Sequence, residues 1–310
     1  MKGFLIKRVF ASLVAIFLVT VLVFLLIHII PGDPIDLLLG EQASAQDKLS
    51  YRMMLGLHLP LHEQYVSFLR SLFSTWGHSI SRNSDVLPLI TARFPSTLFL
   101  ALSGFLTGLF LSLPAGVLSA IKKDSWFDRV VSTVSMLSMS LPIFVVGPFL
   151  TLIFAIRLKW FPVAGYGSVG HLILPSIALG LGLFGVLTRM VRASFLDVMH
   201  EDYMRTARAK GLAPLKIFFI HGLKNALIPV ITLGGSIFGG LLAGAVLTET
   251  LFDWPGIGKL FYSAFQSRDY PLIQGVVLWI SISYFVVNLA VDLLYFWVDP
   301  RVSVEGKAKA

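Results

Sequence analysis

The chain contains no cysteine among its 310 residues, which excludes disulfide bonds, thiol catalysis and cysteine-ligated metal sites. It also lacks a His-Glu-x-x-His zinc motif and a Gly-x-Ser-x-Gly nucleophile elbow. Its two Gly-Lys pairs, at 258–259 and 306–307, miss the glycine that a phosphate-binding loop requires five residues earlier. The sequence therefore predicts no catalytic residue, no metal site and no cofactor bound by this chain.

Charged residues are scarce, at 14% of the sequence, whereas about a quarter is usual for a soluble protein. Long apolar runs take their place. Five runs have the roughly 20 residues needed to cross a bilayer, and a sixth, 172–187, is shorter and rich in glycine. The runs predict an all-α polytopic membrane protein with six transmembrane helices; five is the alternative, if 172–187 is a re-entrant segment. They cover 9–30, 97–121, 131–156, 172–187, 226–247 and 272–298.

The distribution of Lys and Arg predicts that both termini are cytoplasmic. With the N-terminus inside, the cytoplasmic segments hold 16 of these residues and the external segments hold nine. Five of the nine lie in one long loop, where charge has little influence on topology. Because basic residues gather at the cytoplasmic face, the net charge of +8 requires no nucleic-acid partner.

The runs divide the chain into four parts. An N-terminal segment with the first helix covers 1–30, and a long external loop or cap covers 31–96. A five-helix core covers 97–298 and includes a cytoplasmic loop at 192–225, and a cytoplasmic tail covers 299–310. Within the external loop, apolar residues recur at helical spacing over 61–73 and predict an amphipathic helix that lies on the membrane or on a neighbouring segment.

A polar segment, 201–211, separates the fourth and fifth runs. Acidic residues lie at its front, basic residues lie at its back, and a glycine follows, which suits a short helix with its dipole complemented. Such a helix is not needed to cross a bilayer, so it predicts a contact site for another protein; a helix lying on lipid is the alternative. The contact residues are Glu201, Asp202, Tyr203, Arg205, Thr206, Ala207, Lys210 and Gly211.

The fifth run carries two strips of small residues spaced four apart. Such strips allow helix backbones to approach closely in lipid. They predict either packing within the chain or a close contact at a subunit interface or along a substrate path. One strip is Gly235, Gly239 and Ala243, and the adjacent strip is Ser236, Gly240 and Gly244.

Ionisable residues are few inside the predicted helices. Asp292 lies in the last run, with Asn288 one helical turn earlier, and we expect a structural polar role for both. A proton- or sodium-driven carrier is expected to hold more charged or unwound polar positions at mid-membrane. Their scarcity argues against secondary transport.

Several short motifs, in this order and spacing, resemble one family nearly end to end. The chain resembles the inner-membrane permease subunits of bacterial ATP-binding-cassette importers, in the dipeptide/oligopeptide/nickel branch, and is similar to the first permease of the pair. The motifs are Ile30-Pro-Gly-Asp-Pro34, Leu55-Gly-Leu-His-Leu-Pro-Leu61, Arg93-Phe-Pro-Ser-Thr97, Gly165-Tyr-Gly167, Asp202–Gly211, Asn225-Ala-Leu-Ile-Pro229, Glu249–Gly258 and Arg268-Asp-Tyr-Pro271.

The resemblance implies a multi-pass protein of the bacterial inner membrane that forms a translocation pathway with a homologous permease. It further implies two partner ATPase subunits, which bind ATP and Mg, and an external substrate-binding protein. The polar segment aligns on Gly211 with the family's coupling motif and retains its second alanine, Ala207. We expect Ala207 to permit close docking of an ATPase and Gly211 to redirect the chain.

Peptides are the cargo that the resemblance favours. Nickel chelates, glutathione or another small solute are the alternatives within the same transporter class. A passive channel or a membrane scaffold is the alternative of a different class, and it would need neither the polar helix nor ATPase partners.

Overall fold

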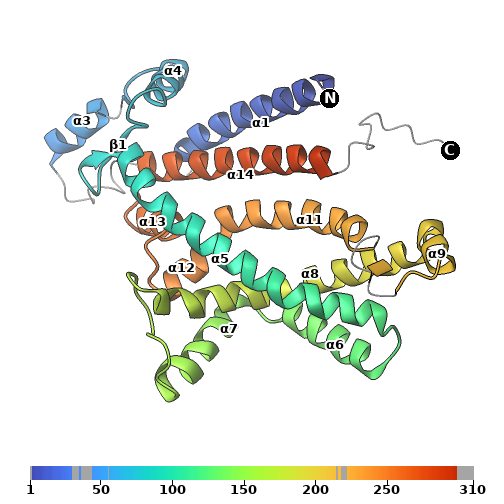
Figure 1. Cartoon of the computed structure of the whole chain (residues 1–310). Helices are drawn as coiled ribbons and strands as arrows, with labels where there is room; N and C mark the ends of the chain where they lie inside the picture. The colour runs from blue at the N-terminus through green and yellow to red at the C-terminus, as the bar shows by residue number, and fades with distance from the viewer. Residues whose placement is uncertain are drawn as a thin grey trace. The chain divides into compact units, whose positions relative to one another are not determined.

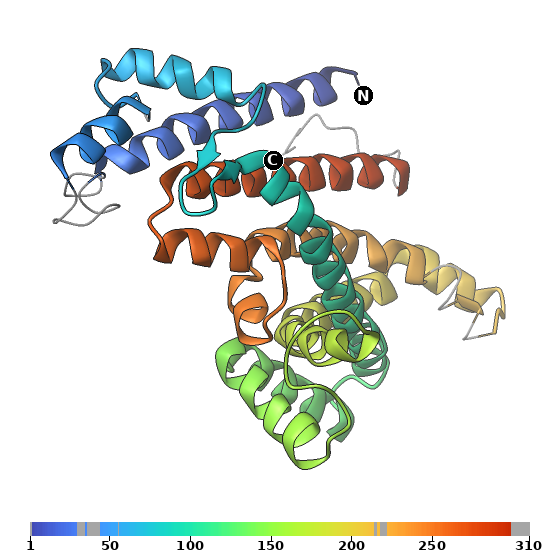
Figure 2. The same ribbon diagram turned by 90° about the vertical axis from the view of Figure 1, so that its left-hand side faces the viewer.

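The computed structural model describes residues 2–29, 35, 44–54, 56–213, 216–217 and 222–298, and it is mainly α-helical (Figures 1 and 2). Five helices are long and apolar enough to cross a membrane, and one sharply bent pair makes a sixth candidate span. The prediction of an all-α polytopic membrane protein is therefore confirmed. The chain divides into two compact units, Met1–Thr97 with Pro255–Phe285, and Leu98–Trp254 with Val286–Ala310.

The first unit contains the helices of the N-terminal third and a small hairpin. Its elements are α1 (Lys2–Ile29), α3 (Ala45–Met54), α4 (Leu61–Ser71), β1 (His78–Ser79), β2 (Ser84–Asp85), α13 (Ile257–Gln266) and the first parts of α5 (Val86–Ile121) and α14 (Tyr270–Val298). The strands pair antiparallel, with His78 opposite Asp85. Val86, Ile90, Leu260, Leu272 and Val276 are fully or almost fully buried in the core of this unit.

The amphipathic stretch predicted at 61–73 is helix α4, and it lies against α1 (Figures 1 and 2). The Tyr65 ring packs edge-on against Phe24, with ring centroids 5.2 Å apart. The hydroxyl groups of Tyr65 and Thr20 are 2.9 Å apart. The apolar face of α4 is thus packed on a neighbouring helix, which is one of the two outcomes that the sequence allowed.

Asp269, which is fully buried, joins the hairpin to α14. Its Oδ2 atom accepts hydrogen bonds from Ser79 Oγ at 2.6 Å, from Ser81 Oγ at 2.6 Å and from the Ser81 amide at 3.0 Å. Its Oδ1 atom accepts from the Leu272 amide, in the first turn of α14, at 3.3 Å. A carboxylate with this many donors can be buried without a large desolvation cost, and it fixes the hairpin on the helix.

The second unit is built around α8 (Val169–His200). Helices α6 (Trp126–Ser140) and α11 (Leu223–Gly244) both pack along α8 (Figure 1). The remaining elements are α7 (Ile143–Leu150), the π-helix η1 (Thr151–Arg157), α9 (Asp202–Ala209), α12 (Val246–Leu251) and the later parts of α5 and α14. Leu174, Leu187, Val191 and Phe195 bury one face of α8 in this unit.

The third apolar run is not a straight helix. Helix α6 meets the continuous segment of α7 and η1, Ile143–Arg157, at an angle of 103°. Leu141 is extended, with φ −87° and ψ 114°, because the ring of Pro142 disfavours the helical conformation of the residue before it. The fourth run, for which the sequence left a re-entrant segment open, is instead part of the 32-residue helix α8. The irregular candidate span is therefore the third one.

Candidate functional site

The polar segment between the fourth and fifth runs folds as predicted into a short helix, α9. Glu201 is extended, with φ −64° and ψ 146°, and ends α8 before α9 begins. Within α9, Thr206 Oγ1 donates to the Asp202 carbonyl at 3.0 Å, and Arg205 Nη1 lies 3.6 Å from Asp202 Oδ1. Because both charged side chains are well exposed, this ion pair contributes little to stability.

One face of α9 is packed inside the chain. Met204 and Ala207 are buried against Ile217, together with Val198 of α8. Ala207 was expected to be small so that an ATPase could dock closely, but the structure gives it a packing role within this chain, with 6% of its surface exposed. A larger side chain there would first displace Met204 or Ile217. Contact between Ala207 and a partner stays a prediction.

The other predicted contact residues lie on the open face of α9 or at its ends. Tyr203 is anchored there, since its hydroxyl accepts a hydrogen bond from Asn225 Nδ2 of α11 at 2.8 Å. Gly211 has φ +70°, a left-handed conformation that is strained for residues with a side chain. It turns the chain after the helix. The exposed residues are Glu201, Asp202, Tyr203, Arg205, Thr206, Lys210 and Gly211.

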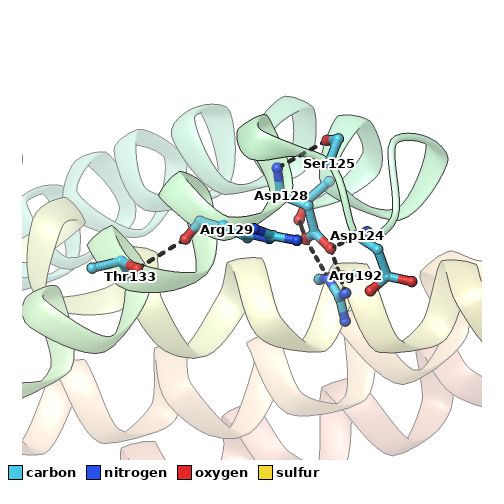
Figure 3. Close-up of polar contacts among 7 residues, drawn as sticks. Asp124, Ser125, Asp128, Arg129, Thr133 and Arg192 are labelled. Atoms are coloured by element: carbon cyan, nitrogen blue, oxygen red, sulfur yellow. Dashed lines mark hydrogen bonds and ion pairs between the residues drawn. The ribbon is translucent and has the colours of Figure 1, made fainter.

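A partly buried ion pair, not foreseen from the sequence, joins α6 to α8 (Figure 3). Arg192 donates from Nε to Asp128 Oδ1 and from Nη2 to Oδ2, both at 2.7 Å. The Asp128 side chain is only 5% exposed. Such a two-pronged contact combines charge with fixed geometry and is among the stronger polar contacts in proteins.

Further hydrogen bonds hold Asp128 in place. Ser119 Oγ of α5 donates to Oδ1, and the Asp124 amide donates to Oδ2 at 2.9 Å. Ser125 caps α6 by accepting a hydrogen bond from the Asp128 amide at 3.3 Å (Figure 3). The carboxylate therefore connects the end of α5, the following loop, α6 and α8. The spacing Ser125-x-x-Asp128 is a capping signal that sequence reasoning could have used.

The two strips of small residues on α11 have different surroundings. A Cβ atom added at Gly235 would lie 2.2 Å from Val291 Cγ2, so the first strip includes a close approach to α14. Ser236, on the second strip, is exposed, and a Cβ at Gly240 would meet nothing within 4 Å. Gly239 is buried, while the side-chain surroundings of Ala243 and Gly244 lie outside the described part of the chain.

Asn288 and Asp292 are half-buried on α14, one turn apart. Each has an interaction partner in the structure. These surroundings are compatible with the structural role that the sequence predicts for both residues.

Two family models match the chain. The model described as "Binding-protein-dependent transport system inner membrane component" matches residues 112–304. The model described as "Binding-prot-dependent transport system membrane comp, N-term" matches residues 1–101. Among curated proteins, the glutathione transport system permease protein GsiC of Shigella flexneri serotype 5b (strain 8401) is 39% identical over 303 residues, which are 97% of this chain and 99% of the relative. GsiC of Escherichia coli (strain K12) has the same identity and coverage.

Solved transporters share the fold. An inward-facing form of the MetNI methionine ABC transporter aligns with a TM-score of 0.60 at 18% identity, over 68% of this chain and 96% of that chain. An amino acid ABC transporter crystallised with histidines aligns with a TM-score of 0.51 at 16% identity, over 70% of this chain and 95% of that chain.

Proposed function

The chain belongs to the family of binding-protein-dependent transport system inner membrane components, and from this premise we propose that it imports small peptides through a pathway shared with a second, homologous permease. It is a multi-pass, non-catalytic permease subunit of an ABC transporter, in which separate ATPase subunits hydrolyse ATP. The 39% identical relatives are named as glutathione permeases, so they favour glutathione, the alternative cargo within the same transporter class.

The observation that carries the proposal is the construction of α9. Met204 and Ala207 anchor one face in the chain, while charged residues on the other face point outward. A helix held in this way can receive a push from a partner without detaching from its own chain. We therefore assign α9 as the segment through which this chain is coupled to the ATPases. The complex holds two ATPase subunits, which bind ATP and Mg. An external binding protein delivers the cargo.

The ion pair supports a route by which such a push would spread. Arg192 lies on α8, ten residues before α9 begins, and holds Asp128 of α6. Two charge-assisted hydrogen bonds of 2.7 Å hold the pair, so it is expected to persist through the transport cycle. Displacement of α9 would then move α8, α6 and the end of α5 together. These helices would alternate between outward- and inward-open arrangements of the pathway.

The test is reconstitution of the complex that co-purifies with the tagged chain. Two ATPase chains and a homologous permease are expected in that complex. In proteoliposomes supplied with the external binding protein, labelled peptides or glutathione should accumulate when ATP and Mg are present. Failure of any ATPase chain to co-purify, or accumulation that is independent of ATP, would contradict the proposal and favour a channel or scaffold.

A further inference from the structure

A cavity of about 590 Å³ that opens widely to the surface lies between α6, α8 and α11 in the second unit. Helix α6 contributes Ser132, Met136 and Met139, α8 contributes Arg189 and Met190, and α11 contributes Leu233. This volume is within the range of pockets that hold small molecules. The thioether side chains are flexible and polarisable, so they can adapt to ligands of different shape.

Two guanidinium groups line the cavity, and only one of them has a carboxylate partner among the described residues. Arg192 is neutralised by Asp128 through the two 2.7 Å hydrogen bonds described above. Arg189 Nη1 contacts the Met139 sulfur at 3.9 Å, and a thioether is a weak acceptor. Within the described part of the chain, no carboxylate lies within 4.0 Å of Arg189. Among the described residues, the cavity therefore presents one positive charge, Arg189, without a carboxylate at ion-pair distance.

Small residues lie beside the cavity on α8 and α11. Ser236 and Gly240, one and two turns after Leu233 on α11, are exposed, and a Cβ at Gly182, two turns before Arg189, would meet nothing within 4 Å. By contrast, the exposed side of α5 is bulky: Phe99, Leu106 and Phe110 are 56%, 52% and 78% exposed. Small residues suit a close or changing contact in the membrane, whereas bulky apolar residues suit lipid. The α8 and α11 sides of the cavity therefore suit a close or changing contact, while Met136 and Met139 on the α6 side, 63% and 49% exposed, are apolar and bulky.

We propose that this cavity is a cargo site in the translocation pathway and that Arg189 binds a carboxylate of the cargo. The inference rests on the proposed function and adds a cargo chemistry to it: a short peptide with a free carboxylate. A guanidinium matches a carboxylate through two parallel hydrogen bonds, which an ammonium or an amide cannot reproduce. Met136, Met139 and Met190 accommodate the variable side chains of the peptide.

The absence of native cysteine allows a direct test with single-cysteine variants. Arg189→Cys is reconstituted with cysteine-free partner subunits, and ATP-driven uptake of trialanine is compared with uptake of its C-terminal amide. We expect the uptake ratio of acid to amide to fall roughly tenfold or more, because a charge-assisted contact is lost. Since the same binding protein serves every variant, its own preference cancels in this comparison.

Charge is then restored chemically. A thiosulfonate reagent that attaches an aminoethyl group should recover part of the ratio, because it restores the positive charge but not the two parallel hydrogen bonds. Reagents that attach neutral hydroxyethyl or negative sulfonatoethyl groups should recover none of it. Arg129→Cys is the matched control, because Arg129 is exposed on α6 and does not line the cavity. It should keep the wild-type ratio with all three reagents.

An unchanged ratio in Arg189→Cys, or equal recovery with the neutral reagent, would overturn the proposal. The Tm of the wild-type complex and of the Arg189→Cys complex is also measured with and without anionic phospholipid. If the substitution abolishes an effect of this lipid on the Tm and leaves the uptake ratio unchanged, Arg189 binds a lipid headgroup and the proposal is overturned. Failure of the wild-type complex to import trialanine or glutathione with ATP would instead refute the proposed function, and this inference with it.

Discussion

The carboxylate of Asp128 and the guanidinium of Arg192 meet through two hydrogen bonds of 2.7 Å across the contact between α6 and α8. The pair is separated by 64 residues in sequence, and it lies close to the point where α8 gives way to α9. This contact fastens α6 to α8, so its loss is expected to weaken the packing of these two helices.

Asp128→Asn should destabilise the complex strongly. The substitution preserves shape but leaves Arg192, whose side chain is 28% exposed, with a neutral partner, and the expected loss is about 1.5–3 kcal/mol of unfolding free energy. Asp197→Asn, at an exposed position of α8, is the control and should change little. Thermal unfolding of the purified complex measures both variants. Equal Tm values for the two variants would contradict the stabilising role of the pair.

Ala207→Leu should uncouple ATP hydrolysis from cargo. The added atoms meet Met204 and Ile217, and overpacking of this kind costs about 1–3 kcal/mol, here in the anchoring of α9. Ala209→Leu adds the same atoms on the exposed side of α9. We expect cargo-stimulated ATPase activity to fall several-fold in the first variant. If the second variant loses as much, the exposed surface rather than the buried anchor is decisive.

Substitutions of Gly211 should follow the preference for the left-handed conformation. Gly211→Val should cost about 1–2 kcal/mol in the turn after α9, because φ is +70° there. Gly211→Asn should cost less, since asparagine tolerates this conformation, and no neighbour blocks a Cβ within 4 Å. Cargo uptake and stimulated ATPase activity are compared. Wild-type values in Gly211→Val would show that the turn does not transmit motion.

The stability of the hairpin should depend on pH through His78. Hydrogen bonds to Asn83 and Asp85 raise the pKa of His78 above its ordinary value of 6.5. The charged form is therefore favoured in the folded state, so its stabilising effect is complete below pH 6.5 and is lost as pH rises through the folded pKa. The Tm difference between wild type and His78→Gln should follow this course. A difference that is constant from pH 5 to pH 9 would disprove it.

Much of the fold could be predicted because it depends on local patterns. Apolar runs located the membrane helices, and the order of charges before Gly211 located α9 to within a residue or two. The position of the irregular span was predicted less well. The glycines of 172–187 suggested a break, yet they lie within the continuous helix α8. The break instead lies in the preceding run, at Leu141-Pro142. The backbone restriction that Pro142 places on Leu141 breaks a helix, whereas the glycines of α8 do not.

The contacts within the candidate site were harder to foresee. Nothing in the local sequence pairs Asp128 with Arg192, and the burial of Ala207 depends on Ile217, which lies beyond the turn at Gly211. The cavity likewise needs three helices to be placed together. Sequence patterns therefore identified the elements that carry the site, whereas the partners of individual side chains depend on tertiary packing.

The attachment of the hairpin to Asp269 provides a place for a spectroscopic reporter. Four hydrogen bonds join the hairpin loop and the first turn of α14 into one rigid piece, and Arg82 reaches from the same loop to Ser263 of α13 at 3.0 Å. A fluorophore attached at Asn83 in this cysteine-free chain would therefore report the motion of α13 and α14 rather than the wobble of a surface loop. The hairpin is therefore a suitable labelling site for following the transport cycle in real time.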